Sequence, residues 1–456
     1  MITQEMTYKA HFAAIWKLGI PLILSNLAMF AIHMTDTIML GWYDVTALAA
    51  ATIATTFFFI IFIVGAGFGQ AVMPMVASAA EENDDVQVRR VTRMAMWLSI
   101  FYGAAVTVPF FWAEQIFLAM GQEPAVAHLG HLYLQIAIWQ MIPQLLVMTL
   151  KSYLAALEHT AVILWATIGT ALMNGLINYA LIFGNFGAPE LGIEGAAIAS
   201  LTVSTATLAI LIAYAVRVLP QYTLFKNFWR SDSEIMRRVF QLGWPIGLTS
   251  LAEGGLFSAS AVMMGWIGAI ELAAHGIALQ LAALAFMVHI GLSQAATVRA
   301  GRALGRKDMA GLKRGGLVAI SVSVLFAMST SLLFVSIPET LVSLFVDPNE
   351  PQRTNLIAIG SGLIMIAALF QLVDAMQVMA LGLLRGLQDT AVPMWIATIS
   401  YWLIGLPASY ILGFVFDYGA KGLWIGLVVG LLSAAVMLMV RFWLGPFRRL
   451  SLEFAV

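Results

Sequence analysis

The sequence contains no cysteine and few charged residues. Among its 456 residues, 10% are Asp, Glu, Lys or Arg and 61% are hydrophobic. The absence of cysteine excludes disulfide bridges, thiolate metal sites and cysteine nucleophiles. Soluble domains carry about 25% charged residues, so the composition predicts an integral membrane protein. The net charge of −1 gives no support to nucleic-acid binding.

Familiar catalytic motifs are also missing. No Lys follows a Gly, so the chain has no Walker A loop for ATP. No His is followed by Glu and no Ser stands in a G-x-S-x-G sequence, which removes two common hydrolase motifs. We therefore expect a protein that is not an enzyme and has no cofactor.

The two halves of the chain repeat one another. A shift of 224 positions places Leu18, Gly19 and Pro21 on Leu242, Gly243 and Pro245. A shift of 230 aligns residues 157–165 with 387–395. Two fused copies of one membrane unit are typical of transporters.

Twelve apolar segments are long enough to span a bilayer, which takes about 20 residues. They are expected at residues 14–41, 47–79, 92–113, 129–156, 161–184, 191–218, 238–266, 271–303, 314–337, 354–384, 390–415 and 419–444. Six helices per copy is an even number, so both copies enter the membrane in the same sense. We predict an all-α integral membrane protein of two parallel six-helix repeats, with lobes at 1–218 and 238–456 and a linker at 219–237.

Basic residues predict the orientation, because short cytoplasmic loops are enriched in Lys and Arg. With the N-terminus inside, 21 of the 23 Lys and Arg residues fall on the cytoplasmic side, and only Arg353 and Lys421 fall outside. Both termini and the 219–237 linker are therefore expected in the cytoplasm. The first apolar segment has no evident cleavage site after it, so we interpret it as a retained helix.

Three acidic residues lie inside predicted helices: Asp36 in the first, Glu253 in the seventh and Asp374 in the tenth. A charge at the bilayer centre costs about 2.5–3.5 kcal/mol, so such groups are protonated, bind a cation or face water. Each occurs in one copy of the repeat only, since the corresponding positions hold Ser260, Met29 and Gln144. This asymmetry favours a role in ion coupling over a role in packing.

Two amides in the fifth predicted helix show the same asymmetry. Asn174 and Asn178 correspond to Ile404 and Ala408 in the second copy. Their spacing of four places them on one helix face, at the membrane depth expected for Asp36. A carboxylate with two amide oxygens suits a hard cation. The alternative is that the amides only bridge helices.

Other polar residues allow a structural interpretation beside the functional one. Glu253 precedes Gly254-Gly255, where a locally opened helix would place the carboxylate in a cavity. His33 precedes Asp36 by one helical turn and could share its proton. It is equally compatible with a hydrogen-bonded structural role, as are His275 and His289.

The motifs resemble the multidrug and toxic compound extrusion family, specifically its NorM-like branch. The resemblance rests on K-L-G-I-P at 17–21, echoed by Q-L-G-W-P at 241–245, and on M-T-D-T-I-M-L-G at 34–41 and L-R-G-L-Q-D-T at 384–390. It implies two lobes around a central cavity that alternate between outward-open and inward-open states. It also implies that Asp36, Glu253 and Asp374 couple a cation to drug export. The amides of M-N-G-L-I-N-Y at 173–179 then belong to a cation site, to which Ser200 adds a hydroxyl where the family often has Thr.

The resemblance implies an antiporter that exports organic, often cationic compounds from a bacterial inner membrane, and we expect a monomer. Na⁺ is favoured over H⁺ as the coupling ion, because a proton switch would not need the two amides. The alternatives are a lipid-linked precursor flippase or another metabolite exporter of the same superfamily. The alternative function that is not active transport is a passive channel or a sensor.

Overall fold

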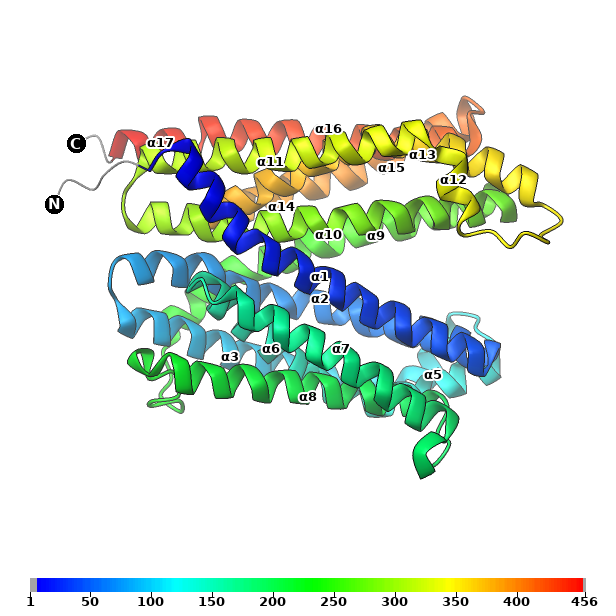
Figure 1. The fold of residues 1–456 in the computed structure, drawn as a ribbon, viewed down its shortest axis with the longest axis horizontal. Coiled ribbons are helices and arrows are strands. Elements are labelled where there is room, and N and C mark those ends of the chain that lie inside the picture. Colours follow the sequence, from blue (N-terminus) through cyan, green and yellow to red (C-terminus); the bar gives the residue numbers. More distant parts are fainter. Residues whose placement is uncertain (1–5, 454–456) are drawn as a thin grey trace. The chain divides into compact units, whose positions relative to one another are not determined.

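The computed structural model describes residues 6–453, and these are helical with short connections (Figure 1). The first half begins with α1 at Tyr8–Tyr43 and α2 at Val45–Glu81. It continues with α3 (Asp85–Thr107), η1 (Val108–Trp112), α4 (Ala113–Ala119), α5 (Pro124–Ala137), η2 (Ile138–Gln140), α6 (Met141–Ala156), α7 (Thr160–Phe183), η3 (Asn185–Gly187), α8 (Ile193–Val218) and η4 (Pro220–Tyr222).

The second half follows the same plan. Its elements are α9 (Ser233–Ile267), α10 (Ala269–Gly305), α11 (Met309–Ser336), α12 (Pro338–Ser343), α13 (Arg353–Gly386), α14 (Ala391–Thr398), η5 (Ile399–Gly405), α15 (Leu406–Tyr410), η6 (Ile411–Val415), α16 (Gly419–Leu444) and α17 (Pro446–Glu453). Twelve helical segments in the described chain are long and apolar enough to cross a membrane. The predicted twelve spans are thereby confirmed.

Several helices begin earlier than their apolar segments do, because acidic residues cap their first turns. Asp84 accepts a hydrogen bond from the backbone N–H of Gln87 at 2.8 Å, so α3 starts seven residues before the predicted span. Asp308 accepts from Gly311 N–H at 2.7 Å and starts α11. A side-chain oxygen at the N-cap satisfies a free N–H of the first turn. The polar turns that begin at Asp85 and Met309 are therefore parts of the helices.

The chain forms two compact units. We call Leu24–Gly247 the N-unit, and we call the residues up to Ile23 together with those from Leu248 onward the C-unit. The prediction divided the chain in sequence order, into lobes at 1–218 and 238–456. In the structure, residues 6–23 belong to the C-unit and residues 219–247 belong to the N-unit. The physical reason is that α1 and α9 are long helices whose two ends pack in different units. Ile23 and Gly247 are equivalent positions of the repeat, since 224 residues separate them.

Within the N-unit, α2 is the central helix and packs against α3, α5 and α6. Almost every residue from Val64 to Ala79 is buried. Glycine allows the closest approach, since a Cβ atom on Gly69 would lie 2.9 Å from the backbone nitrogen of Thr149 on α6. Glycine at this position therefore lets the backbones of α2 and α6 approach closely.

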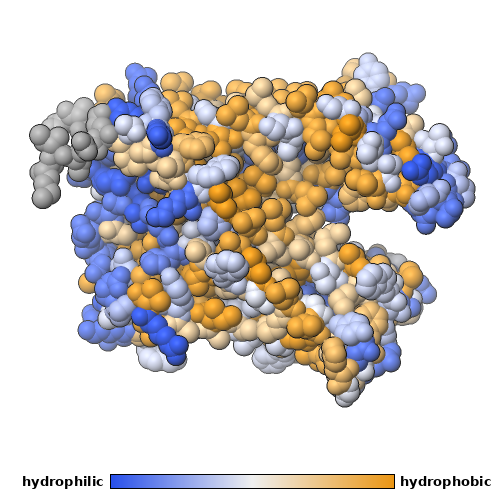
Figure 2. Space-filling model, viewed as in Figure 1, coloured by the Kyte–Doolittle hydropathy of each residue, from blue (hydrophilic) through white to orange (hydrophobic). Residues whose placement is uncertain are grey.

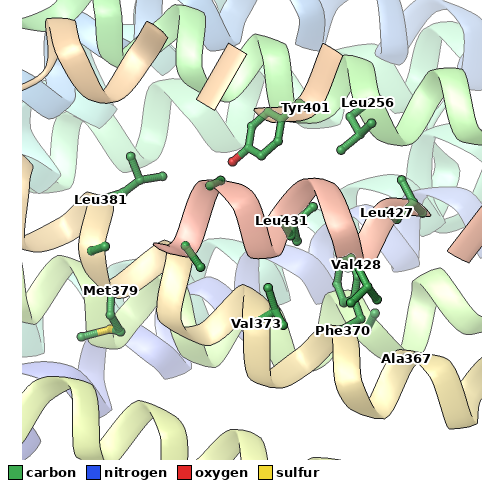
Figure 3. Close-up of a cluster of buried hydrophobic side chains, with 14 of the residues drawn as sticks. Leu256, Ala367, Phe370, Val373, Met379, Leu381, Tyr401, Leu427, Val428 and Leu431 are labelled. Atoms are coloured by element: carbon green, nitrogen blue, oxygen red, sulfur yellow. The ribbon is translucent and has the colours of Figure 1, made fainter. Parts of the chain in front are cut away.

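Within the C-unit, α13 takes the central place and packs against α10, α11 and α16. Figure 3 shows the core that results, with Phe370 and Val373 of α13 beside Val428 and Leu431 of α16. Tyr401 of η5 lies at the same core with its hydroxyl group drawn in red. The η5 and η6 segments are π-helical, a distortion that is frequent at functional sites.

The outer surfaces agree with a membrane environment. Figure 2 shows apolar side chains over the middle of the helices of each unit and hydrophilic side chains toward the helix ends. Large apolar side chains such as Leu332 and Leu172 are each 68% exposed. Lipid, which contacts apolar surface without cost, accounts for this exposure.

Candidate cation-binding sites

The N-unit brings together the three residues that the sequence predicted as one site. Asp36 lies on α1, and Asn174 and Asn178 lie one turn apart on α7. The Nδ2 atoms of the two amides are 2.6 Å and 2.5 Å from Oδ1 of Asp36. Both asparagines are fully buried. The predicted common face and common depth of these side chains are therefore seen in the structure.

The amides present their nitrogen atoms to Asp36, whereas the sequence suggested a cage of oxygens. An amide nitrogen donates hydrogen bonds and a carboxylate oxygen accepts them, so this orientation joins the three side chains. The Oδ1 atoms of Asn174 and Asn178 are buried and have no hydrogen-bond partner among the described residues. A half-turn of each amide about its terminal bond would exchange nitrogen for oxygen. The residues present therefore fit a cation that takes hard oxygen ligands.

Ser200 reaches this site indirectly. Its hydroxyl is a hydrogen-bond partner of Tyr133 on α5, and Tyr133 in turn lies within electrostatic range of Asp36. Asp36 itself receives its side-chain hydrogen bonds from the two amides. The structure thus places Ser200 beside the site and Tyr133 between Ser200 and Asp36. Sequence reasoning missed Tyr133, because nothing in its local pattern distinguishes it from other buried aromatics.

The C-unit holds a second cluster, made by Glu253 of α9, Asp374 and Gln377 of α13, and Tyr401 of η5. Gln377 donates from Nε2 to Oε1 of Glu253 at 3.1 Å, and the same atom lies 2.5 Å from the Tyr401 hydroxyl. Asp374 is 2% exposed, and its Oδ1 atom has no hydrogen-bond partner among the described residues. Asp374 and Gln377 share a face of α13, and Gln377 links this face to Glu253.

Gln377 and Tyr401 were not predicted as site residues. Gln377 follows Asp374 by three positions, so the two share a helix face, and this spacing was the available signal. Tyr401 is far from both acids in sequence and lies in a π-helical turn, where ordinary helical periodicity fails. Its place in the cluster follows only from the tertiary structure.

The helix around Glu253 is continuous, so the predicted local opening at Gly254-Gly255 is wrong. A Cβ atom on Gly255 would lie 2.7 Å from the Trp402 ring. The Trp402 indole N–H donates to the Ala252 carbonyl at 3.1 Å. Glycine at this position allows a large side chain to approach the helix backbone.

The buried histidines have ordinary hydrogen-bond partners. Trp424 donates from its indole N–H to Nδ1 of His275 at 3.0 Å, and Nδ1 of His289 lies 2.8 Å from the Ser323 hydroxyl. These contacts agree with the structural interpretation of both residues. His33 is exposed on α1.

The donor sets limit which ions can bind. Within residues 6–453, no group of three or more His, Cys, Asp and Glu is placed to hold a metal ion. The N-unit cluster offers one carboxylate with neutral oxygens, and the C-unit cluster offers two carboxylates with an amide and a phenol. Such sets suit a monovalent cation or a proton better than a transition metal, which prefers imidazole or thiolate ligands.

Comparison with known proteins adds independent information. The MatE family model matches residues 21–180 and 245–411, and the two matches begin at the equivalent positions Pro21 and Pro245. The chain is 46% identical over 442 residues to a "Probable multidrug resistance protein NorM" of Rhizobium meliloti, covering 96% of this chain and 94% of that protein. A protein of the same name from Agrobacterium fabrum is 44% identical, with coverage of 95% and 94%.

Solved structures support the fold. The eukaryotic MATE transporter AtDTX14 superposes with a TM-score of 0.86 at 18% identity, covering 98% of this chain and 99% of that one. An outward-facing MATE family transporter of the MOP superfamily superposes with a TM-score of 0.84 at 20% identity, with coverage of 97% and 96%.

Proposed function

Because the chain belongs to the MatE family, the multidrug and toxic compound extrusion transporters, we propose that it is a cation-coupled antiporter that exports organic compounds. The observation that carries this proposal is the Asp36 cluster, a half-buried carboxylate inside a membrane helix with two buried amides as its partners. Intramembrane acids of this kind mark ion pathways. The acidic groups favour cationic cargo, and the names of the relatives favour drugs.

Na⁺ is the coupling ion that the N-unit cluster favours. In the structure, the two amide N–H groups donate to Asp36. When Na⁺ enters, rotation of the amides would turn their free oxygens toward the ion and replace part of its water shell. A rearrangement between α1 and α7 would follow, because the hydrogen bonds that join them are broken. Coupling requires that Na⁺ binds the two states of the transporter with different affinity.

Proton coupling remains the second candidate, and the C-unit cluster is the observation that favours it. Asp374 is buried and Glu253 is half-buried, and Gln377, on the same face of α13 as Asp374, contacts Glu253. Two adjacent carboxylates do not ionise together readily, so one of them holds a proton more tightly. Gln377 contacts Glu253 and would sense its charge.

The location is part of the proposal. The relatives are bacterial, and the basic residues predict cytoplasmic termini, so we propose a bacterial inner membrane with both ends of the chain inside. We propose that the monomer is functional.

Transport by purified protein in liposomes tests the function. Vesicles that hold less ethidium than the surrounding solution are given a Na⁺ gradient and, separately, a pH gradient, and dye efflux is followed by fluorescence. Efflux against the dye gradient under the Na⁺ gradient is expected. Flux only down the dye gradient would indicate a channel. Movement of a lipid-linked phosphate and not of dye would indicate the flippase alternative.

A further inference from the structure

A groove of about 410 Å³ lies in the C-unit between the start of α1 and the first half of α11. Figure 1 shows these two segments near one another. The argument uses six of the lining residues: Tyr8, Lys9 and Phe12 from α1, and Leu317, Ser321 and Leu325 from α11.

The groove is apolar along its length and open to the surroundings. Phe12 is 48% exposed and Leu325 is 63% exposed. Both helices are membrane spans, so these side chains face the bilayer and not water. The distance along α11 from Leu317 to Leu325 is about 12 Å. A hydrocarbon chain is the occupant that a groove of this length and polarity accepts in a bilayer.

One end of the groove is positively charged. Lys9 forms part of its wall, and Lys313 lies one helical turn before Leu317 on the same face of α11. Both lysines are exposed. Long Lys side chains bury their methylene groups along apolar surface and place the ammonium group at the membrane interface. The neighbouring Asp308 accepts from Gly311 N–H at the start of α11 and does not line the groove.

We propose that this groove binds an anionic phospholipid, such as phosphatidylglycerol. One acyl chain lies along α11 between Leu317 and Leu325, and the headgroup phosphate lies between the ammonium groups of Lys9 and Lys313. The charge pattern selects this occupant over a zwitterionic lipid, since a net negative headgroup complements two lysines. The site goes beyond the proposed function and does not depend on which ion or cargo the protein carries.

Native mass spectrometry of the full-length protein in detergent tests the proposal. The protein is mixed with equal amounts of phosphatidylglycerol and phosphatidylcholine, and the retained lipids are counted. The wild type is expected to retain phosphatidylglycerol preferentially. Ser321→Trp fills the groove and should remove this lipid. Ser329→Trp is the matched control, because Ser329 is exposed on the same helix face two turns further along and outside the groove.

A second variant tests the headgroup contacts without changing the packing. Lys9→Gln combined with Lys313→Gln should lower the preference for phosphatidylglycerol by about fivefold for each lysine. Equal retention of the two lipids by the wild type would overturn the proposal, and so would undiminished retention by Ser321→Trp. Unchanged preference in the lysine variant would overturn the headgroup assignment, even if Ser321→Trp fails to fold.

Discussion

Asn178 reaches from α7 to Asp36 on α1 and places its Nδ2 atom 2.5 Å from Oδ1 of the carboxylate. Asn174, one turn earlier on the same face, donates to the same oxygen at 2.6 Å. Hydrogen bonds to an ionised group contribute about 1.5–3 kcal/mol each. Any event that neutralises Asp36, whether by a cation or a proton, therefore weakens the link between α1 and α7.

Removing the titratable charge should stop coupling. Asp36→Asn and Asp374→Asn keep the size of the side chain, and each is expected to lower gradient-driven efflux by about 5–150-fold, the usual range of a coupling energy. Asp347→Asn, at an exposed loop carboxylate, is the control. Full efflux by either variant at matched expression would remove that residue from the coupling machinery.

Asn174 and Asn178 should be needed for efflux driven by a Na⁺ gradient and not for efflux driven by a pH gradient. Asn174→Ala combined with Asn178→Ala removes both candidate amide ligands and should raise the Na⁺ concentration for half-maximal efflux. The response to a pH gradient should stay largely unchanged. Asn185→Ala removes a half-buried amide that donates to the Tyr179 carbonyl and is the control. A wild type that follows the pH gradient alone, without Na⁺, would contradict Na⁺ coupling.

Gln377 should position Glu253 and not merely fill space. Gln377→Leu leaves the Glu253 and Tyr401 oxygens without their shared donor. We expect a shifted pH profile of efflux, together with a stability loss of about 1–3 kcal/mol. Gln371→Leu is the matched control, because Gln371 is equally buried on α13 and bonds only the Ala282 carbonyl. If both variants lose stability and keep the wild-type pH profile, Gln377 is structural.

The linker should be accessible from the cytoplasm only. Because the chain has no cysteine, a single Ser231→Cys gives a clean probe at an exposed position. Membrane-impermeant thiol reagents should label it in inverted vesicles and not in intact cells. Labelling from outside would reverse the predicted topology.

The start of α9 should lose stability in acid. Arg90 donates to Asp232 at 2.6 Å and holds the pKa of that carboxyl below its ordinary value. A lowered pKa means that ionised Asp232 stabilises the fold above its ordinary pKa of about 3.9. This contribution is lost as the pH falls through the lowered pKa.

Asp232→Asn should therefore lower the free energy of unfolding at pH 7 by up to about 1 kcal/mol, the range of a partly exposed pair. Below pH ~4 the difference from the wild type should shrink. Thermal melting across pH measures this, with Glu234→Gln as the control for an exposed neighbouring carboxylate. A difference that grows in acid would contradict the assignment.

Sequence patterns predicted the fold well where apolar length decides the structure. The twelve spans follow from hydrophobic runs, because a bilayer imposes one length on every helix. The starts of α3 and α11 could not be predicted from hydrophobic runs, since their first turns are polar and depend on capping by Asp84 and Asp308. The sequence also could not predict that residues 6–23 belong to the C-unit, because this depends on how the two ends of the long helix α1 pack.

The candidate site was predicted in part for a similar reason. Asp36, Asn174 and Asn178 were found because a carboxylate and paired amides are rare in membrane helices. Tyr133 and Tyr401 were not found, because buried aromatics are common there and only tertiary contacts single them out. The direction in which the amides point depends on the charge they face, which the sequence does not encode.

The division of α1 at Ile23 has a consequence for biogenesis. The first turns of α1 leave the ribosome before the whole N-unit, yet they belong to a unit whose remaining residues begin only at Leu248. The C-unit therefore stays incomplete until α16 is inserted, although one of its elements is made before the N-unit. Neither half of the coding sequence specifies a self-sufficient module, so the two halves expressed separately would each need the other to finish folding.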